Sequence, residues 1–271
     1  MDKFFEVANI ASRQAGKIIK DYFHKPKEVS YKGRIDLVTN IDKKAEDAIT
    51  KIIKKSYPNH NILTEESEHL QNPNQEFCWV IDPLDGTTNY VHQFPFVSVS
   101  IALQKNQESI LGIVYNPILE ELFYSEKGKG SFRNGNHISV SKTSDIGNAF
   151  LATGFPYNIK DEKRNNIRNF TKLIRRCRGI RRAGSAAIDL CYVAAGIFDG
   201  FWELELCPWD TAAGILIVEQ AGGTVTNFNG SKFSIFDKEI VATNNRIHNE
   251  LLNILNNRAK LDKKDLKILK E

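Results

Sequence analysis

Cysteine is scarce in this chain of 271 residues, and the four present, Cys78, Cys177, Cys191 and Cys207, never form a CxxC pair. Three of them stand among apolar residues, so we expect reduced thiols in the core and no disulfide framework. The six histidines include no HxH or HxxxH pair, which argues against a zinc site. Any metal bound by the chain should therefore have oxygen ligands.

Long apolar runs are also missing. No run reaches the ~18 residues that a membrane-spanning helix needs, and the first residues, MDKFFEVANI, lack the basic-then-apolar order of a secretory signal. We therefore expect a cytoplasmic protein without membrane contact. The formal net charge of +4 is too small to make nucleic-acid binding the default function. A hydrophobic content of 41% is enough for a sizeable core, which excludes a disordered adaptor.

Helical and strand patterns alternate along the chain. Apolar residues at steps of three and four predict a first helix from Phe4 to Tyr22, and a second fits Ile41 to Lys55. Strands are expected around Ile62, from Trp79 to Ile81, from Phe96 to Leu103, from Ile110 to Tyr115 and, after an Asn116-Pro117 turn, from Glu121 to Ser125. This sheet-rich part corresponds to residues 1–147.

The pattern of residues 148–271 predicts a second, layered α/β half. Its predicted elements are helices near Arg164 to Arg176, from Ser185 to Ala195 and from Asp210 to Ala221, and strands near Gly179 to Arg182 and Asp199 to Glu203. There is no internal repeat and no linker. We therefore expect the two halves to form one compact unit.

The most informative segment is Phe77 to Tyr90, FCWVIDPLDGTTNY. Its first five residues are apolar without alternation, which predicts a strand buried on both faces. Pro83 has no N–H for a ladder, so the chain should turn just after Asp82 and bring Asp85 back beside it. Two carboxylates that close repel each other unless a proton or a cation lies between them. Hard oxygen ligands suit Mg²⁺, Mn²⁺ or Ca²⁺.

Small residues follow these aspartates directly. The backbone N–H groups of Gly86, Thr87 and Thr88 can face an anion, so a cation site and an anion site would adjoin. Either aspartate alone could be an ordinary turn residue. The whole run behind a buried strand instead indicates metal-assisted phosphate chemistry.

Two further acidic positions agree with this reading. Asp210 should lie in the first turn of a helix, where the helix dipole favours a carboxylate that is equally placed to hold a cation. Glu65 and Glu66 follow a short apolar segment, where a solvated acidic turn is the alternative. Four carboxylates would balance the charge of two divalent ions, which together can activate water and stabilise a leaving alkoxide.

These segments resemble a known family. Glu65-Glu66-Ser67, the block from Asp82 to Asn89, Gly184-Ser185-Ala186-Ala187 and Trp209-Asp210-x-Ala212-x-Gly214 are similar, in order and spacing, to the motifs of the inositol monophosphatase family. The resemblance extends from about Asp36 to Asn245 and is specific for the superfamily but much less so for the substrate. It implies an alternating αβαβα sandwich of the sugar phosphatase type, with a metal site between two sheets, and a homodimer.

The resemblance also implies roles for individual residues. Two or three Mg²⁺ ions, with Mn²⁺ possible, would be held by Glu65, Asp82, Asp85, Asp210 and the backbone carbonyl of Leu84. Catalysis would involve Glu65, Thr87 and Asp42, the last two orienting the attacking water. Substrate would contact Asp85, Gly86, Thr87, Thr88, Gly184, Ser185, Ala186 and Asp210, and Glu203 would reach a hydroxyl of the alcohol part. Li⁺ would inhibit by occupying one metal position. Asp42 could also form a capping box with Thr39.

Two basic segments have several interpretations. Five arginines, Arg175, Arg176, Arg178, Arg181 and Arg182, could form a solvated helix end, an oligomer contact, or a site for a second phosphate or nucleic acid. The tail from Lys260 to Glu271 is typical of a solvated terminal helix, with membrane or RNA attachment as the lesser alternative.

The leading expectation is a Mg²⁺-dependent phosphomonoesterase acting on myo-inositol 1-phosphate, because Glu203 can accept hydrogen bonds from adjacent hydroxyls. Fructose 1,6-bisphosphate is second, favoured if the arginines face the site, and 3′-phosphoadenosine 5′-phosphate is third. An RNA or transcription-complex binding protein is the non-enzymatic alternative. A haloacid-dehalogenase phosphatase is disfavoured, because its DxD pair has a spacing of two and Asp82 and Asp85 are three apart.

Overall fold

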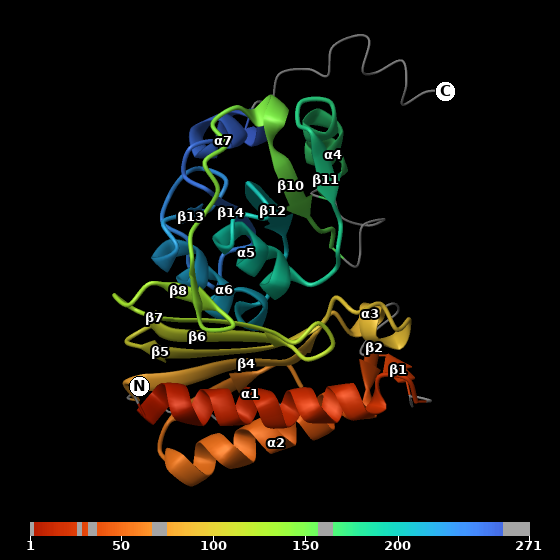
Figure 1. Ribbon diagram of the computed structural model, residues 1–271, viewed down its shortest axis with the longest axis vertical. Coiled ribbons are helices and arrows are strands. Elements are labelled where there is room, and N and C mark those ends of the chain that lie inside the picture. The colour runs from red at the N-terminus through yellow and green to blue at the C-terminus, as the bar shows by residue number, and fades with distance from the viewer. Residues whose placement is uncertain (1–2, 26–28, 32–36, 67–74, 157–164, 257–271) are drawn as a thin grey trace.

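The computed structural model describes residues 3–25, 29–31, 37–66, 75–156 and 165–256, and the basic tail from Lys260 lies outside this part. Two β-sheets are stacked with helices between them and on both outer faces, which gives five layers (Figure 1). The predicted αβαβα sandwich is confirmed. Among the described residues, no helix is long and apolar enough to cross a membrane.

The first outer layer consists of α1 (Lys3–Tyr22) and α2 (Asn40–Ser56), both confirmed as predicted. The face of α1 toward the sheet carries Ala8, Ala11 and Ala15, all fully buried, so the helix axis can approach the sheet closely. A two-stranded ribbon of β1 (Val29–Tyr31) and β2 (Leu37–Thr39) connects the two helices in sequence.

The second layer is a seven-stranded sheet. Its strands in spatial order are β3 (Asn61–Thr64), β4 (Phe77–Asp85), β5 (Ser98–Lys105), β6 (Glu108–Asn116), β7 (Glu121–Glu126), β8 (Ser131–Arg133) and β9 (Asn136–Ile138). Only β3 and β4 pair in parallel. Trp79 and Ile81 pack toward α1 and α2, whereas Val80 packs into the core on the other face. The prediction of a strand buried on both faces is therefore confirmed.

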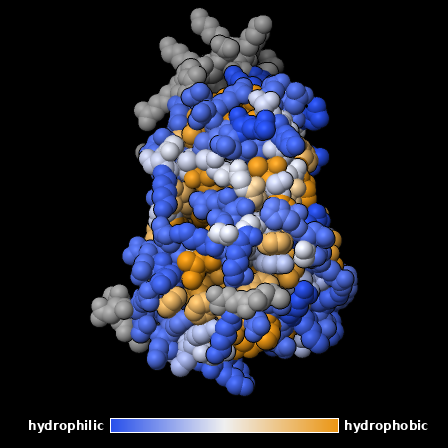
Figure 2. All heavy atoms as spheres, turned by 60° about the vertical axis from the view of Figure 1, so that its left-hand side comes forward, coloured by the Kyte–Doolittle hydropathy of each residue, from blue (hydrophilic) through white to orange (hydrophobic). Residues whose placement is uncertain are grey.

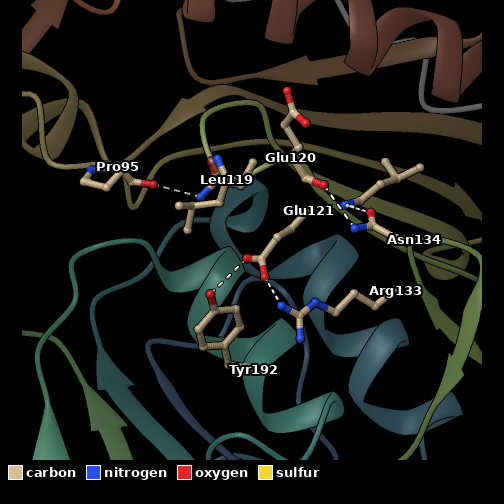
Figure 3. A network of polar contacts seen from close by, with 9 residues as sticks. Pro95, Leu119, Glu120, Glu121, Arg133, Asn134 and Tyr192 are labelled. Atoms are coloured by element: carbon tan, nitrogen blue, oxygen red, sulfur yellow. Dashed lines mark hydrogen bonds and ion pairs between the residues drawn. The ribbon is translucent and has the colours of Figure 1, made fainter.

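The middle layer holds α5 (Ala186–Ala194) and α6 (Pro208–Gln220). A methyl group on Gly112 of β6 would lie 2.7 Å from the carbonyl oxygen of Ala213, so α6 touches the sheet backbone directly. A buried carboxylate fastens α5 to the same sheet: Glu121 accepts a hydrogen bond of 2.9 Å from the Tyr192 hydroxyl and pairs with Arg133 (Figure 3).

The fourth layer is a five-stranded sheet and the fifth is helical. The strands in spatial order are β11 (Gly179–Arg181), β10 (Phe150–Thr153), β12 (Gly200–Leu204), β14 (Glu239–Thr243) and β13 (Thr224–Thr226). Phe201 faces the middle layer, and Trp202 faces the outer helices α4 (Ile167–Ile174) and α7 (His248–Asn256). Strands β1, β2, β8, β9, β10, β13 and β14 and helix α7 were not predicted from the sequence.

Both sheets pack against the middle helices. The division at residues 147 and 148 therefore stays a prediction within a continuous packing arrangement. Hydrophilic side chains cover most of the face in Figure 2, and apolar side chains are visible there in separate patches. All four cysteines are thiols without a disulfide, as expected, but only Cys191 is buried and the other three are partly exposed.

Candidate active site

The end of β4 differs from the sequence prediction. The chain was expected to turn just after Asp82, but this is wrong, because β4 continues to Asp85. Asp82 lies opposite Ser100 and Asp85 opposite Ser98, so three steps on β4 match two steps on β5. In a regular strand, residues three apart point to opposite faces. The extra residue of this bulge turns both carboxylates to the same side, and Pro83 falls where no ladder hydrogen bond is needed.

The two aspartates open into a cavity of about 550 Å³ at the edge between the sheets. Eleven of the predicted site residues line it: Glu65, Asp82, Leu84, Asp85, Gly86, Thr87, Gly184, Ser185, Ala186, Glu203 and Asp210. Segments far apart in sequence therefore meet at one place, although the roles of these residues stay predictions.

Two predicted site residues lie outside the cavity lining. Asp42 is buried in the first turn of α2, where its Oδ1 accepts a hydrogen bond of 3.0 Å from the Thr87 hydroxyl. Thr87 begins the short helix α3 (Thr87–Val91), and Thr88 on the same helix is exposed to solvent. Asp42 is thus linked to the cavity through its hydrogen bond with Thr87. Its alternative as a capping box stays a prediction, because the side chain of Thr39 lies outside the described part.

Asp85 is held at the beginning of α5. Its Oδ2 accepts hydrogen bonds from the Ser185 hydroxyl at 2.5 Å and from the Ala187 N–H at 2.9 Å. Ser185 is also the N-cap of this helix. Burial raises the pKa of Asp85 to about 6, although these hydrogen bonds act to lower it.

Asp210 lies in the first turn of α6, as predicted, and its Oδ2 accepts a hydrogen bond of 2.7 Å from the Cys207 N–H. Burial and the neighbouring Asp85 raise its pKa well above the usual range. Burial also raises the pKa of Asp82, and repulsion by Glu65, Asp85 and Asp210 raises it further. These four carboxyl groups are therefore close enough to oppose each other's ionisation.

This donor set fits a hard divalent cation. Clustered carboxylates that repel one another are stabilised by positive charge, and oxygen ligands suit Mg²⁺ or Mn²⁺. Within the described residues, no group of three or more acidic, histidine or cysteine side chains is already arranged around a single metal position. The fit therefore rests on the charge and chemistry of the set.

Glu203, Arg182 and Asp189 also line the cavity. Burial raises the pKa of Glu203 to about 8, and nearby Arg182 lowers it in part. Asp189, on α5, was missed by the sequence analysis. It is buried, its Oδ1 has no hydrogen-bond partner, and burial followed by repulsion from Glu203 raises its pKa. An aspartate within the apolar segment AAIDLCYVA was the available signal.

The five arginines do not act together on the cavity. Only Arg182 lines it. Arg181, on β11, lies over the ring of Phe150 at 4.6 Å, and Arg178 donates a hydrogen bond to Asn148. The remaining two are exposed near the end of α4.

Asn89 is a second residue whose role the sequence did not indicate. Its Nδ2 donates hydrogen bonds of 2.8 Å to the carbonyls of Phe96 and Ala183. These bonds tie α3 to the turn at Gly184, which has a left-handed φ of 88°. Asn89 thus holds together two of the segments that line the cavity.

Comparisons with known proteins agree with this geometry. The model of the inositol monophosphatase family matches residues 1–260. The Nus factor SuhB of Escherichia coli is 44% identical over 254 residues, covering 93% of this chain and 95% of that protein. An inositol-1-monophosphatase of Synechocystis is 43% identical over 252 residues, covering 93% and 88%.

Solved structures give the same result. Inositol monophosphatase from Anabaena superimposes with a TM-score of 0.86 at 40% identity, covering 93% of this chain and 94% of that one. The extragenic suppressor protein suhB from Bartonella henselae has a TM-score of 0.89 at 37% identity, covering 95% and 100%. The likeness therefore includes the whole layered architecture.

Proposed function

Because the chain belongs to the inositol monophosphatase family, we propose that it is a Mg²⁺-dependent phosphomonoesterase that hydrolyses myo-inositol 1-phosphate and similar polyol phosphates. The observation that carries the proposal is that Glu65, Asp82, Asp85 and Asp210 line one cavity together with Glu203. The first four carboxylates suit a metal-bound phosphate, and Glu203 suits an alcohol with several hydroxyls.

The carboxylates and the Leu84 carbonyl would hold two or three Mg²⁺ ions, with Mn²⁺ as a substitute. Such ions lower the pKa of a bound water and stabilise the negative charge of the leaving alcohol. The hydrogen bonds from Ser185 and the Ala187 N–H keep Asp85 in one orientation before the ion binds. Such preorganisation is a large part of charge stabilisation in catalysis.

Thr87 and Asp42 would orient the attacking water. The Thr87 hydroxyl donates its hydrogen to Asp42 at 3.0 Å, so the lone pairs of its oxygen are available to accept a hydrogen bond from water. Glu65, which lines the same cavity, would accept the proton that this water loses. The reaction is then a direct in-line displacement, in which water attacks phosphorus and the alcohol leaves.

The test is a phosphate-release assay with myo-inositol 1-phosphate, fructose 1,6-bisphosphate, 3′-phosphoadenosine 5′-phosphate and p-nitrophenyl phosphate. We expect activity with Mg²⁺, loss of activity with excess chelator, and the highest kcat/KM on the inositol ester. Li⁺ should inhibit by taking a metal position without supplying divalent charge. Full activity in chelator would contradict the metal mechanism.

A bisphosphate substrate is the lesser alternative within the family. A second phosphate would need Arg182, but this guanidinium already interacts with the carboxyl groups of Glu203 and Asp189, whose pKa values it lowers. An ionised carboxylate beside Arg182 would compete with a second phosphate for the same cation. Arg182→Ala should raise KM for fructose 1,6-bisphosphate selectively if that substrate is used, because uniform binding would be lost. Arg181→Ala is the matched control.

A second function, attachment to nucleic acid or a transcription complex, is supported by the relatives called Nus factors and by exposed arginines outside the cavity. Replacing Arg175, Arg176 and Arg178 by glutamine should then weaken RNA binding and reduce its salt dependence. Phosphate release should be unchanged. Equal RNA binding by the wild type and the triple glutamine variant would contradict this second function. The homodimer and the cytoplasmic location also remain proposals.

A further inference from the structure

Thr153 and Gly154 form the wall of the cavity beside Glu203. Strand β10 runs parallel to β12, with Thr153 directly opposite Trp202. The residues that follow them, Gly154 and Glu203, are therefore also neighbours. A Cβ atom on Gly154 would lie 1.9 Å from Oε1 and 2.2 Å from Cδ of Glu203. The carboxyl group of Glu203 therefore occupies the space that any other side chain at position 154 would need.

Backbone conformation does not explain this glycine. Gly154 is absent from the residues with positive φ, so alanine could adopt the same backbone conformation without left-handed strain. The glycine is therefore explained by the lack of space for a side chain at this position. The steric clash of an alanine with Glu203 would be relieved by movement of the flexible Glu203 side chain.

Gly154 itself cannot withdraw from Glu203, because a buried amide holds it. Asn166 donates hydrogen bonds from Nδ2 to the Gly154 carbonyl at 2.6 Å and to Thr153 Oγ1 at 2.9 Å. Its Oδ1 accepts a bond of 2.8 Å from the indole N–H of Trp202, the residue before Glu203. Thr153 Oγ1 also donates to the Trp202 carbonyl at 2.6 Å. A buried polar network that is satisfied in this way is rigid.

We infer that Gly154 is a positioning residue that sets substrate selectivity. Asn166 holds the backbone of Gly154 in place, and the lack of a side chain there leaves room for the Glu203 carboxyl group to contact the hydroxyls of the alcohol part. The inference rests on the proposed function for the identity of that alcohol. Gly154 is not among the predicted metal ligands, so its effect should act mainly on binding of the alcohol part through Glu203.

The test is a double-mutant cycle of Gly154→Ala and Glu203→Gln, with myo-inositol 1-phosphate and p-nitrophenyl phosphate as the substrates. The aryl ester has no hydroxyls for Glu203. Each single change should lower kcat/KM for the inositol ester by roughly 10- to 150-fold, which is the value of one charged hydrogen bond. Both changes should lower kcat/KM for the aryl ester far less than for the inositol ester. The double variant should lose no more than Glu203→Gln alone, because both changes remove the same interaction.

Gly179→Ala is the matched control. Gly179 lies on the neighbouring strand β11, and a Cβ there would meet no atom closer than 3.7 Å. Its kinetics should equal those of the wild type on both substrates. Equal losses on both substrates from Gly154→Ala, or additive losses in the double variant, would overturn the inference, because a general structural defect would then be the cause.

Calorimetric binding of myo-inositol 1-phosphate in the presence of Mg²⁺ separates this inference from the proposed function. Binding without hydrolysis would refute the proposed function. The inference about Gly154 would then be tested by comparing the affinity of Gly154→Ala and the wild type for myo-inositol 1-phosphate. A loss of at least about tenfold in Gly154→Ala supports the inference, whereas equal affinity refutes it. A chain that hydrolyses only the aryl ester and does not bind the inositol ester remains a phosphatase and refutes the inference. Absence of both binding and hydrolysis refutes both.

Discussion

The pKa of Asp82 is raised by burial and by all three other carboxyl groups of the cluster. Asp82→Asn should lower kcat by at least ~10² to 10³, because a preorganised charged group is lost. In chelator, the variant should be at least as stable as the wild type, because repulsion is relieved. Phosphate release and thermal unfolding measure the two effects. Nearly normal Mg²⁺-dependent turnover would contradict the site.

The pKa of Asp85 predicts how pH affects the metal-free protein. Its folded value of about 6 lies above the ordinary value near 3.9. The folded state therefore binds this proton more tightly than the unfolded state. The resulting stability is complete below about pH 4 and is lost as the pH rises through about 6, by roughly 3 kcal/mol for this group alone.

Mg²⁺ should reverse this loss, because it needs the ionised carboxylates. At one hundred times its Kd, a ligand adds about 2.7 kcal/mol of stability. We therefore expect Mg²⁺ to raise the midpoint of thermal unfolding clearly at pH 7.5 and much less at pH 5. Differential scanning fluorimetry with Mg²⁺ and with chelator at both pH values measures this. An equal effect of Mg²⁺ at both pH values would show that these carboxyl groups do not bind it.

At the scale of elements, the contact between β6 and α6 determines where Asp210 lies. The three atoms nearest to a Cβ on Gly112 would be backbone atoms of Ala213, at 2.7 to 3.2 Å, and backbone cannot rotate away as a side chain can. Gly112→Ala should destabilise the fold by roughly 1 to 3 kcal/mol. It should also weaken Mg²⁺ binding, because α6 would move away from β4. Urea unfolding and Mg²⁺ titration measure both effects, and unchanged stability would contradict the close contact.

The bulge in β4 shows how far the elements could be predicted. The buried strand was evident from its unbroken apolar run, and Pro83 correctly indicated an irregularity. The type of irregularity was not evident, because a turn and a bulge both tolerate proline. Pairing with β5 decides between a turn and a bulge. Asp82 pairs with Ser100 and Asp85 still pairs with Ser98, which shows that the strand continues. The two aspartates meet in either case, but by different geometry.

The whole molecule should unfold as one unit, because the middle helices share a core with both sheets. Trp79 is buried in the first sheet and Trp202 in the second, so each reports on one half. In variants in which Trp209 and one of these two tryptophans are replaced by phenylalanine, the fluorescence midpoint should coincide with the circular dichroism midpoint of the same variant. Separate midpoints would show that residues 1–147 and 148–271 unfold as independent domains.

The amino-acid sequence by itself indicated alternating helices and strands in both halves, including most of the helices, and its resemblance to a family implied the sandwich. Periodicity and residue chemistry are local properties, so the motifs around Asp82 and Asp210 could also indicate the chemical type of the site. Tertiary structure alone decided which arginine reaches the cavity, that Asp189 is buried beside it, and that Gly154 leaves room for Glu203. These features depend on contacts between segments far apart in the chain, and a sequence pattern does not contain the distances between them.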